Sequence, residues 1–258
     1  MTNDNVLTLM VQAAEKAGLA LLASYDPASR PPGRAAMYEL GTQLEATSTT
    51  IVREALDGAV PGVDWWDEDE RGRVVPPGRW WVVDGAEGAV NHVHGLPEWG
   101  VTITLVTDGQ PERTVVRRPI GDLTWTAARG QGARLNGELL RVSAKTDLSA
   151  AAVTASQAGN DRGVYERFAS AFVEMASRAL LVRNTIPTVF PLLGLTSGQY
   201  DVFWQYEPDL PGTAAGSLLA GEAGAIVTDL AGSAWDVNAA DILVAAPGLH
   251  ASALEVLR

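Results

Sequence analysis

The stretch that decides the fold is residues 81–97, which read Trp81-Val82-Val83-Asp84-Gly85-Ala86-Glu87-Gly88-Ala89-Val90-Asn91-His92-Val93-His94-Gly95-Leu96-Pro97. The apolar run that ends at Val83 is typical of a buried strand, and Asp84-Gly85 stops it. A carboxylate therefore lies at the end of a strand. A second carboxylate, Glu87, and an amide, Asn91, follow within a few residues. This grouping predicts a polar site at one edge of a sheet.

Working outward, the spacing of apolar residues predicts alternating helices and strands. Helical spacing indicates helices over residues 5–24, 49–57, 163–177, 189–197, 211–224 and 248–257. The second of these is expected to start at Ser48 or Thr49 as N-cap. Short apolar or alternating runs indicate strands over residues 80–83, 102–106, 114–118, 123–127, 151–155, 180–182, 226–228 and 242–244. The class is therefore α/β or layered α+β.

Composition narrows the range of partners. The 258 residues are 47% hydrophobic and 19% charged, and the net charge is −12 with only two lysines, Lys16 and Lys145. Nucleic-acid binding relies on Lys and Arg, so no nucleic-acid partner is expected. The chain has no cysteine, no secretory leader, and no apolar run near the ~20 residues that a membrane span needs. We expect a cytoplasmic protein with a small-molecule substrate and no membrane partner.

The stretch 81–97 resembles the signature of the inositol monophosphatase family, a strand ending in Asp-Pro-x-Asp-Gly-Thr and then x-Asn-Phe-x-x-Gly-x-Pro. Further stretches match family patterns in the same order, at residues 130–137, 214–219 with 222–224, and 241–250. The resemblance implies an α-β-α-β-α sandwich with an N-terminal α+β half (1–147) and a C-terminal α/β half (148–258). It also implies a pocket between the halves and a homodimer.

In the family that this chain resembles, carboxylates hold Mg²⁺ ions that polarise the phosphoryl group and activate water. This sequence departs from that pattern. Asp84 is retained, but Glu87 replaces an Asp, and Ala89 replaces the Thr that orients water. Gly212 stands where the family has an Asp ligand, and Asp209, three residues away, is expected to point elsewhere. The sequence therefore indicates a degenerate metal site.

The partner of the missing Thr is expected within residues 47–50, where no Asp occurs, and Glu45 is a possible displaced substitute. The helix that starts near Pro211 and Gly212 is expected to offer free N–H groups to an anion. Two positions that the resemblance places near the substrate also differ from the family. Ile186 and Pro187 stand where the family has Gly-Ser, and Gln205 stands where it has an acidic residue. Both changes indicate a less charged pocket.

Residues 67–70 correspond to the family's Glu-Glu loop, and either a solvated loop or a pocket-facing Glu68 or Asp67 fits them. Trp65 and Trp66 are read either as core residues or as a wall of the pocket. His92 is read either as a proton-exchanging group near Asp84 or as a ring without a role.

Together these features favour a repurposed enzyme without a cofactor. It is expected to catalyse cyclisation, dehydration or isomerisation of a biosynthetic intermediate by general acid/base chemistry. The groups assigned to that chemistry are Asp84, Glu87, Glu68, Asp67 and His92, with Trp65, Trp66, Asn91, Ile186, Gln205, Pro211 and Gly212 around the substrate. One alternative is a residual Mg²⁺-dependent phosphomonoesterase with a single ion on Glu68, Asp84 and Glu87. The other is a non-catalytic binding protein.

Overall fold

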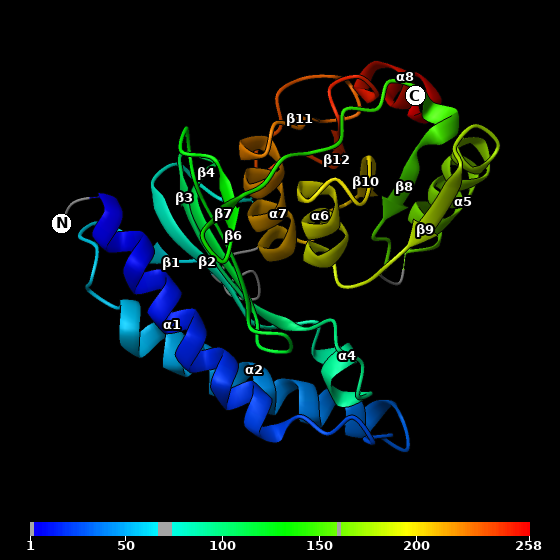
Figure 1. The fold of residues 1–258 in the computed structure, drawn as a ribbon. Helices are drawn as coiled ribbons and strands as arrows, with labels where there is room; N and C mark the ends of the chain where they lie inside the picture. The colour runs from blue at the N-terminus through cyan, green and yellow to red at the C-terminus, as the bar shows by residue number, and fades with distance from the viewer. Residues whose placement is uncertain (1–2, 67–73, 159–160) are drawn as a thin grey trace.

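A computed structural model describes residues 3–66, 74–158 and 161–258 of the chain. Its elements form five layers, with two sheets separated by one pair of helices and covered on each outer side by another pair (Figure 1). The predicted α-β-α-β-α sandwich is therefore confirmed.

The first sheet contains seven strands in the order of the chain. They are β1 (Asp64–Trp65), β2 (Arg79–Glu87), β3 (Gly100–Thr107), β4 (Gln110–Arg118), β5 (Leu123–Ala128), β6 (Ala133–Leu135) and β7 (Glu138–Leu139). Only the β1–β2 pair is parallel. The β2–β3 register shifts between Asp84 and Glu87, so the signature stretch leaves the regular ladder where its two acids lie.

The outer face of this sheet is covered by α1 (Asn3–Ser24) and α2 (Arg34–Leu56), which contact β4, β3 and β2 (Figure 1). Buried side chains from both helices pack against side chains of the sheet in one hydrophobic core. This core includes Met10, Leu21, Val52, Leu56, Trp81, Trp99 and Ile103. This core fixes the position of α2 against β2, and α2 supplies one acidic side chain to the site.

The second sheet has the order β11-β12-β10-β8-β9. Its strands are β8 (Ala152–Ala155), β9 (Leu181–Asn184), β10 (Val202–Tyr206), β11 (Ile226–Thr228) and β12 (Asp241–Ala245), and the 3₁₀ helix η1 (Leu148–Ala150) precedes them. The helices α6 (Val189–Thr196) and α7 (Leu210–Glu222) lie between the sheets, and α5 (Arg162–Ala176) and α8 (His250–Leu257) lie outside (Figure 1). The short α4 (Ala89–Val93) follows β2.

Most predicted elements occur within a few residues of their expected bounds, but the second helix does not. It begins at Arg34 with Gly33 as N-cap, well before Ser48, and none of its residues before Ser48 is buried. Met37, Leu40 and Leu44 in this half are spaced as on one helical face, so the periodic signal was present and was overlooked. The strand β10 was also missed, because all five of its residues are buried and show no alternation.

The expectation that no segment suits a membrane span was wrong for α1. Asn5–Ser24 is long and apolar enough by length and composition to cross a membrane. The same composition is found in core helices, and α1 buries Val6, Met10, Ala13, Ala14, Ala17 and Leu21 against the sheet. Packing on the sheet therefore accounts for part of its apolar character.

Candidate active site

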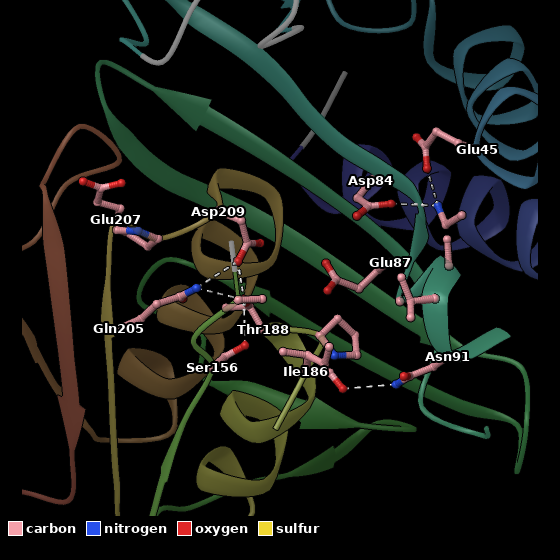
Figure 2. A pocket seen from close by; sticks show the side chains of 17 residues that line it. Glu45, Asp84, Glu87, Asn91, Ser156, Ile186, Thr188, Gln205, Glu207 and Asp209 are labelled. Carbon is pink, nitrogen blue, oxygen red and sulfur yellow. Dashed lines mark hydrogen bonds between the residues drawn. The ribbon is translucent and has the colours of Figure 1, made fainter. Parts of the chain in front are cut away.

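A cavity of about 540 Å³ lies where the end of β2 faces the loops that precede α6 and α7. Three segments contribute acidic side chains to this pocket, namely α2, the end of β2 and the loop before α7 (Figure 2). The lining consists of Glu45, Asp84, Ala86, Glu87, Gly88, Ala89, Val90, Asn91, Ser156, Ala158, Ile186, Pro187, Thr188, Gln205, Glu207, Pro208 and Asp209.

Glu45 connects α2 to the end of β2. Its Oε1 accepts hydrogen bonds from Gly85 N (3.1 Å) and Thr49 Oγ1 (2.7 Å), and its Oε2 accepts one from Ala86 N (2.9 Å). Ala86 N also donates to Asp84 Oδ1 at 2.8 Å. The helix approaches closely here, because a Cβ on Gly85 would lie only 2.5 Å from Thr49 Oγ1. Glu45 is thus fixed beside Asp84, and glycine at position 85 permits the approach.

Glu87 extends from β2 toward the start of α6. Its side chain is 2% exposed, and the backbone N–H of Val189 donates to its carboxylate. Its second oxygen, Oε2, is buried without a hydrogen-bond partner among the described atoms. An ionised oxygen that is buried without a partner destabilises the folded state by several kcal/mol unless it binds a cation or a proton.

Asp209 caps the N-terminus of α7. Its Oδ2 accepts from Gly212 N at 3.2 Å. A Cβ on Gly212 would lie 2.7 Å from Asp209 Oδ2 and 3.0 Å from Glu87 Oε2. The carboxylate of Asp209 therefore fills the space that a side chain at position 212 would occupy. The expectation that Asp209 points elsewhere was wrong, and so was the expectation of an open helix N-terminus for an anion.

A network of hydrogen bonds fixes the wall beside Asp209. The Thr188 hydroxyl donates to Asp209 Oδ1, and Ser156 Oγ lies 3.1 Å from Thr188 Oγ1. Gln205 Nε2 lies 3.3 Å from both Thr188 Oγ1 and Asp209 Oδ1, and Gln205 Oε1 accepts from Thr213 Oγ1. Thr188 and Gln205 therefore orient Asp209, and they are held in turn by Ser156 and Thr213 (Figure 2).

The clustered acids change one another's protonation. Burial, then the charge of Glu45 and a hydrogen bond with it, raises the pKa of Asp84 well above its usual range. Burial, then the charges of Asp84 and Asp209, raises the pKa of Glu87 in the same direction. Like charges in a desolvated pocket disfavour ionisation unless a cation neutralises them.

The donor chemistry of the pocket fits a Mg²⁺ ion. Asp84, Glu87 and Asp209 offer the hard carboxylate oxygens that Mg²⁺ prefers. The unpartnered Glu87 Oε2 and Asp209 Oδ2 both lie within 3.0 Å of the position that a Cβ on Gly212 would occupy. In their present rotamers, no three acidic or histidine side chains in residues 3–66, 74–158 and 161–258 come close enough together to ligate one ion. Ion binding therefore requires these side chains to turn.

The structure brings together only some of the side chains that the sequence indicated. Ile186, Gln205 and Asn91 line the pocket with Asp84 and Glu87, and Asn91 Nδ2 donates to Glu98 O (2.8 Å) and Ile186 O (3.1 Å). Asp67 and Glu68 lie outside the described residues.

Trp65 and Trp66 do not reach this pocket. With Pro211 they line a second cavity of about 340 Å³ on the other side of Glu45 and Asp84. Trp66 is buried and packs edge-to-face on Trp80 with ring centroids 5.8 Å apart. The Arg53 guanidinium lies 4.7 Å from the ring centroid of Trp65.

His92 lies away from Asp84 and Glu87. It is buried, its Nε2 lies 2.9 Å from Leu21 O, and its ring packs on Tyr25 and Trp99 with centroids 5.4 and 4.6 Å away. Burial lowers the pKa of His92. These contacts connect α4 to α1, so the structure does not place His92 for proton transfer in the pocket.

Comparison with known proteins decides the family. A family model described as the inositol monophosphatase family matches residues 2–258. This chain belongs to the inositol monophosphatase family. An inositol-1-monophosphatase of Mesorhizobium japonicum is 30% identical over 240 residues, which cover 90% of this chain and 88% of that protein.

Two further relatives carry another name. A Pseudomonas aeruginosa protein called Nus factor SuhB is 33% identical over 155 residues, 59% of this chain and 57% of that relative, so the match spans little more than half of its length. The crystal structure of extragenic suppressor protein suhB from Bartonella henselae superposes with a TM-score of 0.81 at 25% identity, and the match covers 100% of this chain and 99% of that one.

Family membership overturns the functional prediction from the sequence. The expected metal-independent cyclase, dehydratase or isomerase is wrong, because the family is named for a phosphatase and a relative aligned over nearly its whole length is named inositol-1-monophosphatase. The expected absence of a cofactor is wrong for the same reason, since members of this family are Mg²⁺-dependent phosphatases. The physical error was to count carboxylates by motif position, which excluded Asp209.

Sequence reasoning did not place four polar residues in this site, namely Asp209, Thr188, Ser156 and Glu207. One signal was present for Asp209, because Asp209-Leu210-Pro211 is a typical helix start, with an acidic N-cap and proline in the first turn. An N-cap side chain lies at the helix end, which is where the pocket is. Thr188 and Ser156 follow strand ends that only the tertiary fold brings together.

Proposed function

We propose that this protein is a Mg²⁺-dependent phosphatase that releases inorganic phosphate from a small-molecule phosphate monoester. The observation that carries the proposal is the convergence of Glu87 and Asp209 beside Gly212 in a pocket that also contains Asp84. Family membership supports the reaction class. The unpartnered Glu87 Oε2 supports a cation at this point.

In this proposal Asp84, Glu87 and Asp209 hold the ion. Bound Mg²⁺ supplies Lewis-acid polarisation of the phosphoryl group and acidifies a water. Glu45 positions Asp84, because its carboxylate fixes the backbone of residues 85 and 86. Thr188 and Gln205 orient Asp209 from the opposite wall. The reaction breaks the ester P–O bond, and water contributes the new oxygen of phosphate and the proton of the alcohol.

The test is release of phosphate from phosphate monoesters with Mg²⁺ and with EDTA. We expect Mg²⁺-dependent turnover that is lost in Asp84→Asn and Glu87→Gln. The matched control Glu174→Gln changes an exposed acid on α5 and is expected to keep full activity. Equal release in EDTA, or full activity of both pocket variants, contradicts the proposal.

We also propose that the protein forms a homodimer through the edge strand β9. Leu180 and Leu181 beside this edge are 67% and 38% exposed, and in the described sheet β9 pairs only with β8. An exposed apolar edge is suited to pairing with a second copy. Light scattering on Leu181→Lys tests this, and a monomeric wild-type protein contradicts it.

A further inference from the structure

The part of the pocket away from the carboxylates is apolar at its mouth. Val90 on α4 and Ile186 before α6 line it, and they are 49% and 41% exposed. The two segments lie side by side, because Asn91 Nδ2 donates to Ile186 O at 3.1 Å. Small apolar residues continue the surface, namely Ala89, Ala158, Pro187 and Pro208. Such a surface gains free energy when an apolar group covers it.

The polar side chains near this surface already use their donor hydrogens. Asn91 Nδ2 donates to two carbonyls, Glu98 O and Ile186 O. Thr188 donates to Asp209, which leaves Ser156 to donate to Thr188. Gln205 Nε2 points at Thr188 and Asp209. A ligand with several hydroxyl groups therefore finds few donors for its oxygens. Its own O–H groups can donate to the carboxylates of the lining, but each buried oxygen that accepts no hydrogen bond weakens its binding.

The charges around the pocket are of one sign. No Lys, Arg or His belongs to its lining among the residues described, whereas Glu207 adds a fifth acid to Glu45, Asp84, Glu87 and Asp209. A bound cation suits one phosphoryl group. Among the described lining residues, a second phosphate or a carboxylate on the substrate meets only negative charge, which disfavours bisphosphates and acidic sugars.

We infer that the substrate is a phosphate monoester of an alcohol with an apolar body and no second anionic group. This inference rests on the proposed phosphatase function. The phosphoryl group lies at the carboxylates, and the alkyl or aryl body lies against Val90 and Ile186. Hydrolysis transfers the phosphoryl group to water and releases a poorly hydroxylated alcohol.

The test compares cyclohexyl phosphate with inositol 1-phosphate, because both have a six-membered carbon ring and only the second is hydroxylated. We expect kcat/KM with Mg²⁺ to be at least about tenfold higher for cyclohexyl phosphate, the effect of leaving even one hydroxyl unpaired. The cyclohexanol leaving group is the less reactive of the two, so intrinsic reactivity does not produce this preference.

Two variants place a hydroxyl on the apolar surface. Val90→Thr does so at nearly constant shape, and Ile186→Thr does so with the loss of one terminal methyl group. Each is expected to lower the preference for cyclohexyl phosphate roughly two- to tenfold, as one added hydrogen bond allows. Val173→Thr, on the exposed face of α5, is the matched control and is expected to leave the ratio unchanged.

The outcomes separate the inference from the function on which it rests. Mg²⁺-dependent hydrolysis that favours inositol 1-phosphate overturns the apolar substrate and leaves the phosphatase intact. An unchanged ratio in both threonine variants also overturns it, since the surface then does not contact the substrate. No phosphate release from either ester contradicts the phosphatase itself.

Discussion

In the proposed site, the carboxylate of Asp209 takes the place of the ligand that the resemblance to the family implies at position 212, and exchanging the two positions tests this. Asp209→Ser, the single variant that belongs to the double variant below, and Asp209→Asn each remove a proposed ligand. We expect Mg²⁺ affinity to fall at least about 10–100-fold, since removing a mere supporting residue of a metal site already costs that much. Gly212→Asp alone places a Cβ 2.7 Å from Asp209 Oδ2, closer than folded proteins tolerate. Overpacking of this kind costs about 1–3 kcal/mol, which lowers Tm by roughly 2–12 °C in a chain of this size.

The double variant Asp209→Ser with Gly212→Asp is expected to recover both the Mg²⁺ affinity and the thermal stability. Serine still caps α7, and its shorter side chain clears the space for the new carboxylate. Mg²⁺ binding is measured by isothermal titration calorimetry, and stability by thermal unfolding. Thr188→Val is the control, because it removes the hydrogen bond to Asp209 but keeps the carboxylate.

The decisive quantity is the coupling between the two substitutions. The double variant is expected to bind Mg²⁺ more tightly and to be more stable than the sum of the two single effects predicts. The difference from that sum is expected to exceed about 1 kcal/mol in each free energy. Additive effects refute the exchange of ligand positions. Wild-type Mg²⁺ affinity in Asp209→Asn refutes the role of Asp209 as ligand.

Three further predictions follow from the same contacts. Gly85→Ala should displace α2, destabilise the fold by about 1–3 kcal/mol and weaken Mg²⁺ binding through Glu45; wild-type values in titration and unfolding contradict this. Burial lowers the pKa of His92, so the unfolded chain binds its proton more tightly and the free energy of unfolding falls as pH drops below about 6.5. Denaturant titrations above and below this pH should show that the free energy of unfolding falls less in His92→Phe than in the wild-type protein. Because the pKa values of Asp84 and Glu87 are raised, Mg²⁺ affinity should increase with pH and binding should release protons, which calorimetry in buffers of different ionisation enthalpy detects.

The fold was predictable because its strongest signals are local. The run before Asp84, the alternation in β3 and the apolar spacing in α1 and α5 each follow from neighbouring residues, and the motif order supplied the layer arrangement. The same local reasoning failed for the first half of α2 and for β10. In α2 the helical spacing of Met37, Leu40 and Leu44 was overlooked, whereas β10 is buried throughout and shows no alternation.

The site was predictable only where the sequence places its residues on one element. Asp84, Glu87 and Asn91 follow one another on β2 and α4, and all three line the pocket. Glu45 and Asp209 reach it from elements far apart in the chain. Their contribution depends on the approach of α2 at Gly85 and on the cap of α7, which are tertiary features. Reading a metal site by motif position alone therefore gave the wrong chemistry.

The most direct test of a Mg²⁺ site built from relocated carboxylates is a crystal structure determined with Mn²⁺, whose anomalous signal identifies the ion. We predict an anomalous peak in the pocket with oxygens of Asp84, Glu87 and Asp209 as ligands, and the loss of this peak in Asp209→Asn crystals. A fully occupied ion that does not contact Asp209, or a pocket without a peak at saturating Mn²⁺, contradicts it.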